Sequence, residues 1–251
     1  DYEALLAQGS PNTFRYAEHD ENDPVALCYT SGTTGRPKGV AYSHRSTILH
    51  TLVASLGDFW GLRGTDAVLP VTPMFHANSW GMPYGAVMMG VKLVFPGPHL
   101  HPDDLLDLIT LEPPTLSLGV PTIWMSLIQA YDASQVEGSP NKGRWTLPRG
   151  MKSLVGGAAV PESLIRAFDK HGIWILQGWG MTETSPVCTI SYPRAELRGV
   201  HREDGLAAEE FSLDAFTELV AWVHAKSALL ARRAPTEPDE PTSRPAPTGI
   251  T

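Results

Sequence analysis

Between residues 25 and 176 the chain alternates short apolar runs with longer segments of helical periodicity, and this alternation is what most constrains its fold. The expected strands span 25–29, 67–71, 92–95, 115–118, 152–155 and 173–176, and the expected helices span 43–57, 79–90, 102–112, 121–132 and 161–172. Strands separated by helices in this way predict a mostly parallel sheet with helices on both faces. The sequence therefore predicts the α/β class, in which ligands bind beyond the carboxyl ends of the strands.

Composition excludes several classes of protein. The chain has 251 residues, a net charge of −8 and 42% hydrophobic residues. An acidic chain without a basic face argues against a nucleic-acid partner. No apolar run approaches the ~20 residues that a membrane span needs, and its two cysteines suit a reducing compartment. We therefore expect a cytoplasmic protein without a membrane span, and the sequence leaves a homodimer open.

Five segments that follow the expected strands are rich in glycine, hydroxyl groups and isolated functional side chains. They span 30–39, 72–81, 119–122, 156–160 and 177–186. Because parallel strands end at one edge of their sheet, we expect these segments to form one composite site. Ordinary loops are also polar, which accounts for the glycines but not for the isolated side chains. Those side chains are Lys38, His76, Trp80 and Glu183.

Residues 30–39, TSGTTGRPKG, have the composition of a phosphate-binding loop. Free backbone N–H groups and hydroxyl donors suit phosphate oxygens, and Lys38 adds a positive charge. A helix directly after the loop would add the positive end of its dipole. The spacing is not that of the common P-loop, because Pro37 stands where that motif needs glycine. The segment therefore predicts a phosphate loop of another family, with a flexible linker as the alternative.

The same stretch, YTSGTTGRPKGV at 29–40, resembles the signature loop of the AMP-forming adenylate-forming superfamily, which includes acyl-CoA synthetases, luciferases and the adenylation domains of peptide synthetases. Three further stretches fit in order, namely PMFHANSWG at 73–81, VGGAAVP at 155–161 and QGWGMTETSP at 177–186. The pattern is most similar to medium- and long-chain fatty-acid–CoA ligases. The resemblance covers residues 1–199 and implies the central part of the AMP-binding (adenylation) domain, which is a partial large domain of that fold.

The resemblance implies two half-reactions and a nucleotide site. A carboxylic acid reacts with ATP to give an acyl-adenylate and pyrophosphate, and the thiol of coenzyme A (CoA) then displaces AMP, so the expected partners are the acid, ATP, CoA and Mg²⁺. The β- and γ-phosphates would be held by Thr30, Ser31, Gly32, Thr33, Thr34, Gly35 and Lys38. The adenine would lie between Gly156, Gly157 and Ala158 on one side and Gln177, Gly178 and Trp179 on the other.

The resemblance also implies the reactive part of the site. Glu183 would hold Mg²⁺ with help from Thr30, because this hard cation prefers oxygen ligands. Thr182 would contact the α-phosphate, and His76 would orient the substrate carboxylate or the α-phosphate, although a lone loop histidine is otherwise interpreted as structural. Trp80 would form a wall or gate of the acyl pocket, or else pack in the core. The implied catalytic residues are Lys38, His76, Thr182 and Glu183.

The chain departs from the resemblance after residue 199. Residues 200–233 predict an atypical helical tail, and residues 234–251 predict a disordered, proline-rich end. The family's later ribose-binding Asp, hinge and small C-terminal domain are not recognisable, so we expect the chain by itself to be catalytically impaired. Two alternatives stay open, namely an aryl- or amino-acid-activating enzyme, and a non-catalytic nucleotide-binding fragment or the product of a damaged gene.

Overall fold

The structure of the protein is a computed structural model, and it describes residues 1–191 with the exception of 11, 31–35 and 58. The expected helical tail at 200–233 and the proline-rich end at 234–251 lie outside the described residues. So does the central part of the expected phosphate loop. The described strands form a six-stranded sheet in the order β4-β3-β5-β6-β7-β8 and a separate two-stranded sheet, β1-β2.

The large sheet confirms the predicted α/β class. Its strands are β3 (Ala67–Pro70), β4 (Lys92–Leu93), β5 (Leu116–Gly119), β6 (Lys152–Val155), β7 (Trp174–Gly180) and β8 (Val187–Ile190). β3 to β7 pair in parallel, and β8 alone pairs antiparallel, with β7. The strand β8 was not expected, and β7 runs four residues beyond the expected end at 176 because its last residues pair with β8.

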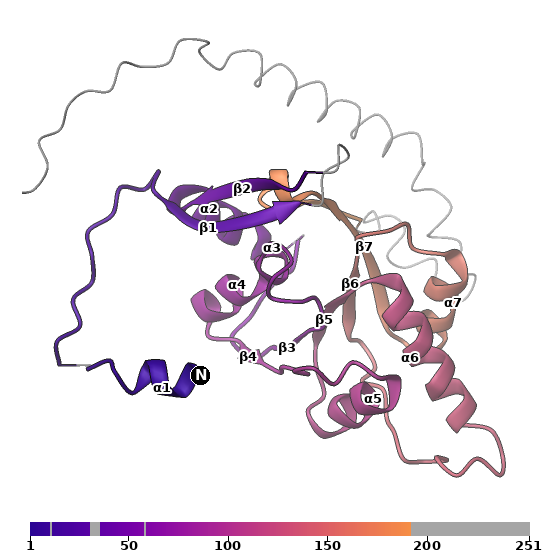
Figure 1. The fold of residues 1–251 in the computed structure, drawn as a ribbon. Helices are drawn as coiled ribbons and strands as arrows, with labels where there is room; N and C mark the ends of the chain where they lie inside the picture. The colour runs from indigo at the N-terminus through magenta and orange to yellow at the C-terminus, as the bar shows by residue number, and fades with distance from the viewer. Residues whose placement is uncertain (11, 31–35, 58, 192–251) are drawn as a thin grey trace, which may run out of the picture. The chain divides into compact units, whose positions relative to one another are not determined.

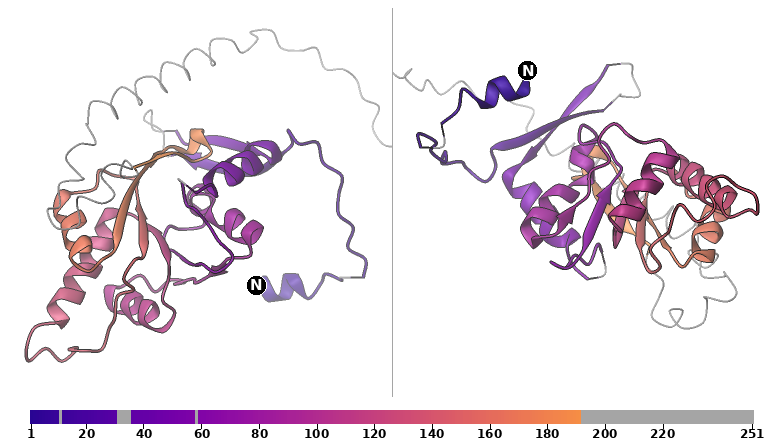
Figure 2. Two further views of the ribbon diagram at one scale, coloured as in Figure 1. Left: turned by 180° about the vertical axis from the view of Figure 1, so that it is seen from behind. Right: turned by 90° about the horizontal axis from the view of Figure 1, so that it is seen from below.

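Helices cover both faces of this sheet, as the alternation predicts. One face carries α5 (Pro102–Leu111), α6 (Pro121–Ser134) and α7 (Glu162–Lys170), and the other carries α2 (His44–Ala54) and α4 (Met82–Met89) (Figures 1 and 2). Neighbouring residues of β6 show the division, because Leu154 belongs to the core on one side and Val155 to the core on the other. Burying one such side chain stabilises the fold by about 1.5–3 kcal/mol.

The first strand was expected correctly but its pairing was not. β1 (Pro24–Thr30) pairs antiparallel with β2 (Lys38–Ser43), which was expected to be loop. Lys38 therefore lies on a strand, and α2 begins only at His44. The helix expected after the phosphate loop is present as α2, but residues 40–43 of β2 separate it from the end of the loop, so its first turn does not adjoin the loop.

Two helix ends illustrate how local chemistry sets the boundaries. Ser43 caps α2 as expected, with its Oγ accepting from the N–H of Ser46 at 3.1 Å and its own N–H donating to Ser46 Oγ at 3.1 Å. The helix expected at 79–90 divides into α3 (Ala77–Trp80) and α4, because Gly81 has a φ of 76°.

α1 (Tyr2–Leu6) precedes β1 in the sequence. Among the helices of the described residues, none is long and apolar enough to cross a membrane.

Candidate functional site

A cavity of about 490 Å³ lies beyond the carboxyl ends of β3, β6 and β7. Its lining brings together residues from four of the five predicted segments, and the segment 119–122 contributes none. The predicted site residues that line it are Thr30, Lys38, His76, Trp80, Gly156, Gly157, Gly178, Trp179, Thr182 and Glu183. The other lining residues are Ala77, Leu154, Gly180, Met181, Pro186 and Val187.

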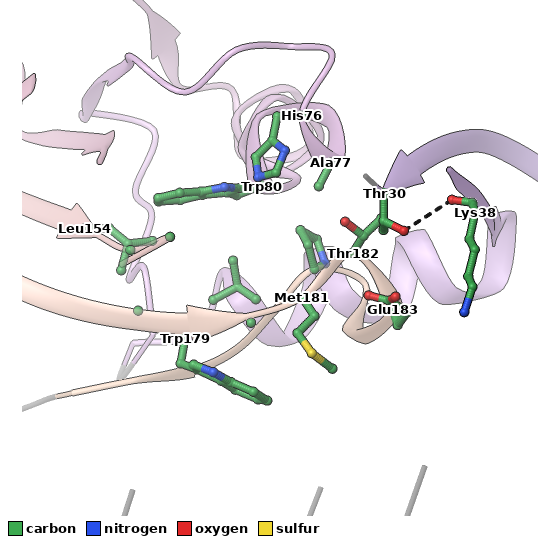
Figure 3. Close-up of a pocket in the computed structure, with 16 residues that line it drawn as sticks. Thr30, Lys38, His76, Ala77, Trp80, Leu154, Trp179, Met181, Thr182 and Glu183 are labelled. Atoms are coloured by element: carbon green, nitrogen blue, oxygen red, sulfur yellow. Dashed lines mark hydrogen bonds between the residues drawn. The ribbon is translucent and has the colours of Figure 1, made fainter. Parts of the chain in front are cut away.

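The cavity has a polar end and an apolar end (Figure 3). Thr30, Lys38 and Glu183 lie together at one end, and Trp80 and Leu154 lie at the other. The polar end offers hydroxyl, ammonium and carboxylate groups, whereas the apolar end offers only hydrocarbon and aromatic surface. The arrangement therefore suits a ligand that carries charged oxygens at one end and an apolar group at the other.

The two charged groups of the polar end are available to a ligand. Within residues 1–191, as far as they are described, no ion pair engages Lys38 or Glu183, and both residues are exposed. Thr30 and Lys38 are paired across the hairpin, and Thr30 Oγ1 donates to the Lys38 carbonyl at 3.5 Å. The hairpin thus presents an ammonium and a hydroxyl from adjacent positions. The ammonium can donate to phosphate oxygens, whereas the Thr30 hydroxyl already uses its one proton on the Lys38 carbonyl and therefore offers its oxygen lone pairs.

The segment between His76 and Gly81 is a turn of left-handed helix. Ala77, Asn78, Ser79 and Trp80 have φ values of 47°, 53°, 52° and 56°. For residues other than glycine this backbone costs roughly 1–2 kcal/mol each. The turn sends Trp80, which is 8% exposed, into the core while one side of its ring lines the cavity. Trp80 therefore packs in the core and also lines the cavity, and its role as a wall or gate of an acyl pocket stays a prediction.

Glycine is required where β6 and β7 pass each other under the cavity. A Cβ on Gly156 would lie 2.8 Å from the Gly178 carbonyl oxygen, and a Cβ on Gly178 would lie 2.8 Å from Leu154 Cδ1. Glycine was expected at both positions to let a ligand approach the backbone. The backbone of the neighbouring strand excludes a side chain at Gly156, so strand packing alone is sufficient reason for that glycine, whereas a Cβ on Gly178 would require the Leu154 side chain to shift.

A family model for AMP-binding enzymes matches residues 2–205. The chain belongs to the AMP-binding enzyme family. It is 45% identical over 213 residues to a medium-chain-fatty-acid–CoA ligase of Ectopseudomonas oleovorans, covering 84% of this chain and 36% of that protein. It is 44% identical over 195 residues to a long-chain-fatty-acid–CoA ligase of Thermus thermophilus, covering 74% of this chain and 34% of that protein.

A solved structure of this family has the same fold. The inhibitor-bound N-terminal domain of FACL13 from Mycobacterium tuberculosis superposes with a TM-score of 0.61 at 26% identity, covering 74% of this chain and 44% of that one. The AMP-binding chain spans 36% and 34% of the two ligases, about a third of their length. The activity of a whole ligase is therefore a proposal for this chain.

Some predicted residues of the AMP-binding chain do not line the cavity. Ala158 is exposed outside it, and Gln177 lies in β7, where its N–H donates to Ser191 Oγ at 2.9 Å. Residues 31–35 lie outside the described residues. No group of three or more His, Cys, Asp or Glu side chains placed to hold a metal occurs in the part of the chain that the structure describes. Glu183 and Thr30 stay the metal ligands that the resemblance implies.

Tyr42 is a residue of the site that sequence reasoning missed. Its hydroxyl donates to the Thr182 carbonyl at 2.6 Å, and burial raises the pKa of Tyr42, so the phenol keeps its proton. The bond joins β2 to the short helix η1 (Thr182–Thr184), which carries Glu183. Tyr42 therefore holds the hairpin, with Lys38, next to the acidic turn.

Replacing Tyr42 with phenylalanine tests this connection. Tyr42→Phe keeps the ring but leaves the Thr182 carbonyl without its donor, so we expect the free energy of unfolding to fall by about 1–2 kcal/mol. Chemical denaturation measures the change. Tyr131→Phe is the matched control, because Tyr131 packs on His171 away from the cavity and the described residues give its hydroxyl no hydrogen bond. An equal loss in both variants would contradict the assigned connection.

His50 makes the edge strand sensitive to pH. Its Nε2 accepts from the Val187 N–H at 3.3 Å, and burial lowers the pKa of His50 below its ordinary value of 6.5. The unfolded chain therefore takes up this proton more readily than the folded chain. We expect the free energy of unfolding to fall as the pH drops below about 6.5 and to become level below the folded pKa.

The variant His50→Gln isolates this contribution. Chemical denaturation at neutral pH and at about pH 5 should show a smaller loss of stability in the variant than in the native chain. His101→Gln, on the exposed loop before α5, is the control and should keep the native pH dependence. The assignment fails if His50→Gln leaves the pH dependence unchanged.

Proposed function

We propose that this chain forms the ATP- and acid-binding part of an AMP-forming acid–CoA ligase that activates medium- or long-chain fatty acids. The observation that supports the proposal most is the single cavity that joins Lys38 and Glu183 to an apolar end formed by Trp80 and Leu154. Membership of the AMP-binding enzyme family and the similarity to the two fatty-acid–CoA ligases support the same reaction. A cytoplasmic location and a homodimer stay predictions of the sequence.

In the proposed reaction the polar end binds the triphosphate. Lys38 and the hydroxyl of Thr30 approach the β- and γ-phosphates together with residues 31–35. Thr182 and His76 lie further along the cavity and contact the α-phosphate and the attacking carboxylate. In this step a carboxylate oxygen attacks the α-phosphorus and pyrophosphate leaves, so the adenylyl group moves to the acid, and this transfer needs position and charge neutralisation more than proton transfer. Residues on separate elements therefore act by holding the two substrates in line.

The same end fits Mg²⁺. A carboxylate oxygen of Glu183 and the hydroxyl of Thr30 are hard oxygen donors that lie at one end of the cavity. Mg²⁺ is usually held by one or two carboxylates, with phosphate and water completing its shell. The absence of a larger acidic cluster in the described residues agrees with this pattern. When bound, Mg²⁺ would neutralise charge on the phosphates, and Glu183 would fix its place.

The other ligands follow from the lining. The adenine would lie against the bare backbone of Gly156, Gly157 and Gly178, with the ring of Trp179 beside it. The alkyl chain of the acid would start between His76 and Trp80 and continue toward Leu154. CoA enters as the second substrate after pyrophosphate has left. Ala158 and Gln177 keep only the roles that the resemblance implies.

ATP–pyrophosphate exchange tests the proposal. A protein that contains this chain at the length of its relatives should support exchange with octanoate or palmitate, and added CoA should then release AMP. Preference for benzoate or for an amino acid would replace the fatty-acid assignment. If none of the acids supports exchange, a non-catalytic nucleotide-binding protein would be favoured instead. The 251 residues alone should support little exchange, and robust exchange would refute that expectation.

A further inference from the structure

The left-handed turn at Ala77–Trp80 needs a restraint, because a strained backbone persists only where its surroundings hold it. His76 immediately precedes the turn and Trp80 ends it, and both side chains line the cavity. The positions of the His76 and Trp80 side chains therefore depend on the conformation of the turn. The roles proposed above use both groups but leave the restraint unexplained.

The restraint is a buried pair of hydroxyl groups. Ser79 is 0% exposed, and its Oγ donates to the Thr72 carbonyl at 2.8 Å. Because serine has one hydroxyl proton, the 2.6 Å contact between the two hydroxyls has Thr72 Oγ1 as its donor. Both hydroxyl protons are then used. Ser79 is thus bound twice to Thr72 in the middle of the strained turn.

Thr72 is in turn fixed to the large sheet. Val71, the residue before it, donates its N–H to the Leu118 carbonyl at 2.9 Å, which continues the pairing of β3 with β5. A second tie to the turn is weaker, since Asn78 Oδ1 accepts from the thiol of Cys28 at 3.4 Å and a thiol is a poor donor. The serine–threonine pair is therefore the main side-chain hydrogen-bonded connection of the turn to the sheet, beside the packing of Ala77 and Trp80 in the core.

We propose that Ser79 is a positioning residue, which holds His76 and Trp80 in place in the cavity through its hydrogen bonds to Thr72. Its effect on catalysis rests on the proposed ligase function, whereas its effect on the turn does not. In the proposed reaction, loss of the Ser79 hydroxyl misplaces the groups that meet the acid. The triphosphate contacts, which come from the hairpin and from η1, stay in place.

Two measurements on Ser79→Ala test the proposal. The first is the indole N–H signal of Trp80 in the protein labelled with ¹⁵N-tryptophan, identified among the seven tryptophans by its loss in Trp80→Phe. Ser79→Ala should shift or split this signal, and Thr72→Val should change it less, because Ser79 can still donate to the Thr72 carbonyl. The second is kinetic, in the full-length ligase. KM for the fatty acid should rise about tenfold, with less than about a twofold change in the Kd of MgATP.

Ser117→Ala is the matched control, because Ser117 is equally buried and donates to Ser153 Oγ at 3.0 Å within the sheet. The proposal is overturned if Ser79→Ala leaves the Trp80 signal unchanged, or if the control displaces it as far. Should Ser79→Ala not fold, Thr72→Val carries the test, because it removes one of the two hydrogen bonds and should still displace the Trp80 signal further than Ser117→Ala does. A shifted signal in a protein that ligates no acid would refute the ligase function and leave the positioning role standing.

Discussion

Glu183→Gln is expected to lower the rate of ATP-dependent acyl-adenylate formation by about 10²–10³-fold. Glutamine keeps the size of the side chain but removes the one carboxylate that lines the polar end of the cavity among the described residues. Mg²⁺ would lose its charged protein ligand, so the charge on the triphosphate would be less well neutralised. ATP–pyrophosphate exchange across a range of Mg²⁺ concentrations measures the effect, and the variant should need more Mg²⁺ for half-maximal rate.

The matched control for Glu183 is Glu162→Gln. Glu162 is also an exposed glutamate, but it begins α7 and pairs with Arg166 rather than lining the cavity. An exposed pair of this kind contributes little, so the control should keep the native exchange rate. Equal exchange rates in the Glu183 and Glu162 variants would show that Glu183 does not take part in the reaction.

Gly180→Ala is expected to have the largest effect on stability, a loss of about 3 kcal/mol or more in the free energy of unfolding. A Cβ at this position would overlap the Pro186 carbonyl oxygen and lie 2.9 Å from Val187 Cα. Both obstacles are backbone, so no side chain can move aside. The pairing of Gly180 with Val187, which closes the β7–β8 edge at the cavity, would have to open.

Gly57→Ala is the control for this substitution. A Cβ on Gly57 meets nothing within 4 Å, and its backbone is not in the left-handed region. We expect a change of less than about 1 kcal/mol, in either direction. Urea denaturation of the two variants should separate them clearly. If Gly180→Ala unfolds at the same midpoint urea concentration as the native chain, the close approach of β7 and β8 is wrong.

The parts of the fold that could be predicted from the sequence are those that depend on local periodicity. Alternating apolar runs and amphipathic helices predict a parallel sheet covered on both faces, and Ser43 predicts the start of α2. The strands β2 and β8 were missed because each forms through an antiparallel partner, and their short, glycine- or serine-flanked sequences are also typical of loops. The left-handed turn at 77–80 was not expected: the sequence places residues 72–81 in a segment after a strand, with an ordinary helix from residue 79, because residue type alone does not specify a positive φ.

The site residues divide in the same way, into those recognisable from the local sequence and those recognisable only from a contact in the fold. His76 and Glu183 follow strands of the parallel sheet and could be placed together because parallel strands end at one edge, whereas Lys38 reaches the cavity from the separate antiparallel hairpin β1–β2. Tyr42 and Ser79 could not be found this way, because each acts through a hydrogen bond to a partner residue that the sequence alone does not identify. Tyr42 meets Thr182 at a separation of 140 positions, and Ser79 is recognisable only once the turn that it restrains is known.

A crystal structure of the protein grown with ATP and Mg²⁺ is the most direct measurement of whether the one cavity binds the nucleotide. The account predicts phosphate density between Lys38 and Glu183, metal density within reach of the Glu183 carboxylate, and adenine density against Gly156 and Gly178. Nucleotide bound elsewhere, or bound with its phosphates at the Trp80 and Leu154 end, would contradict it.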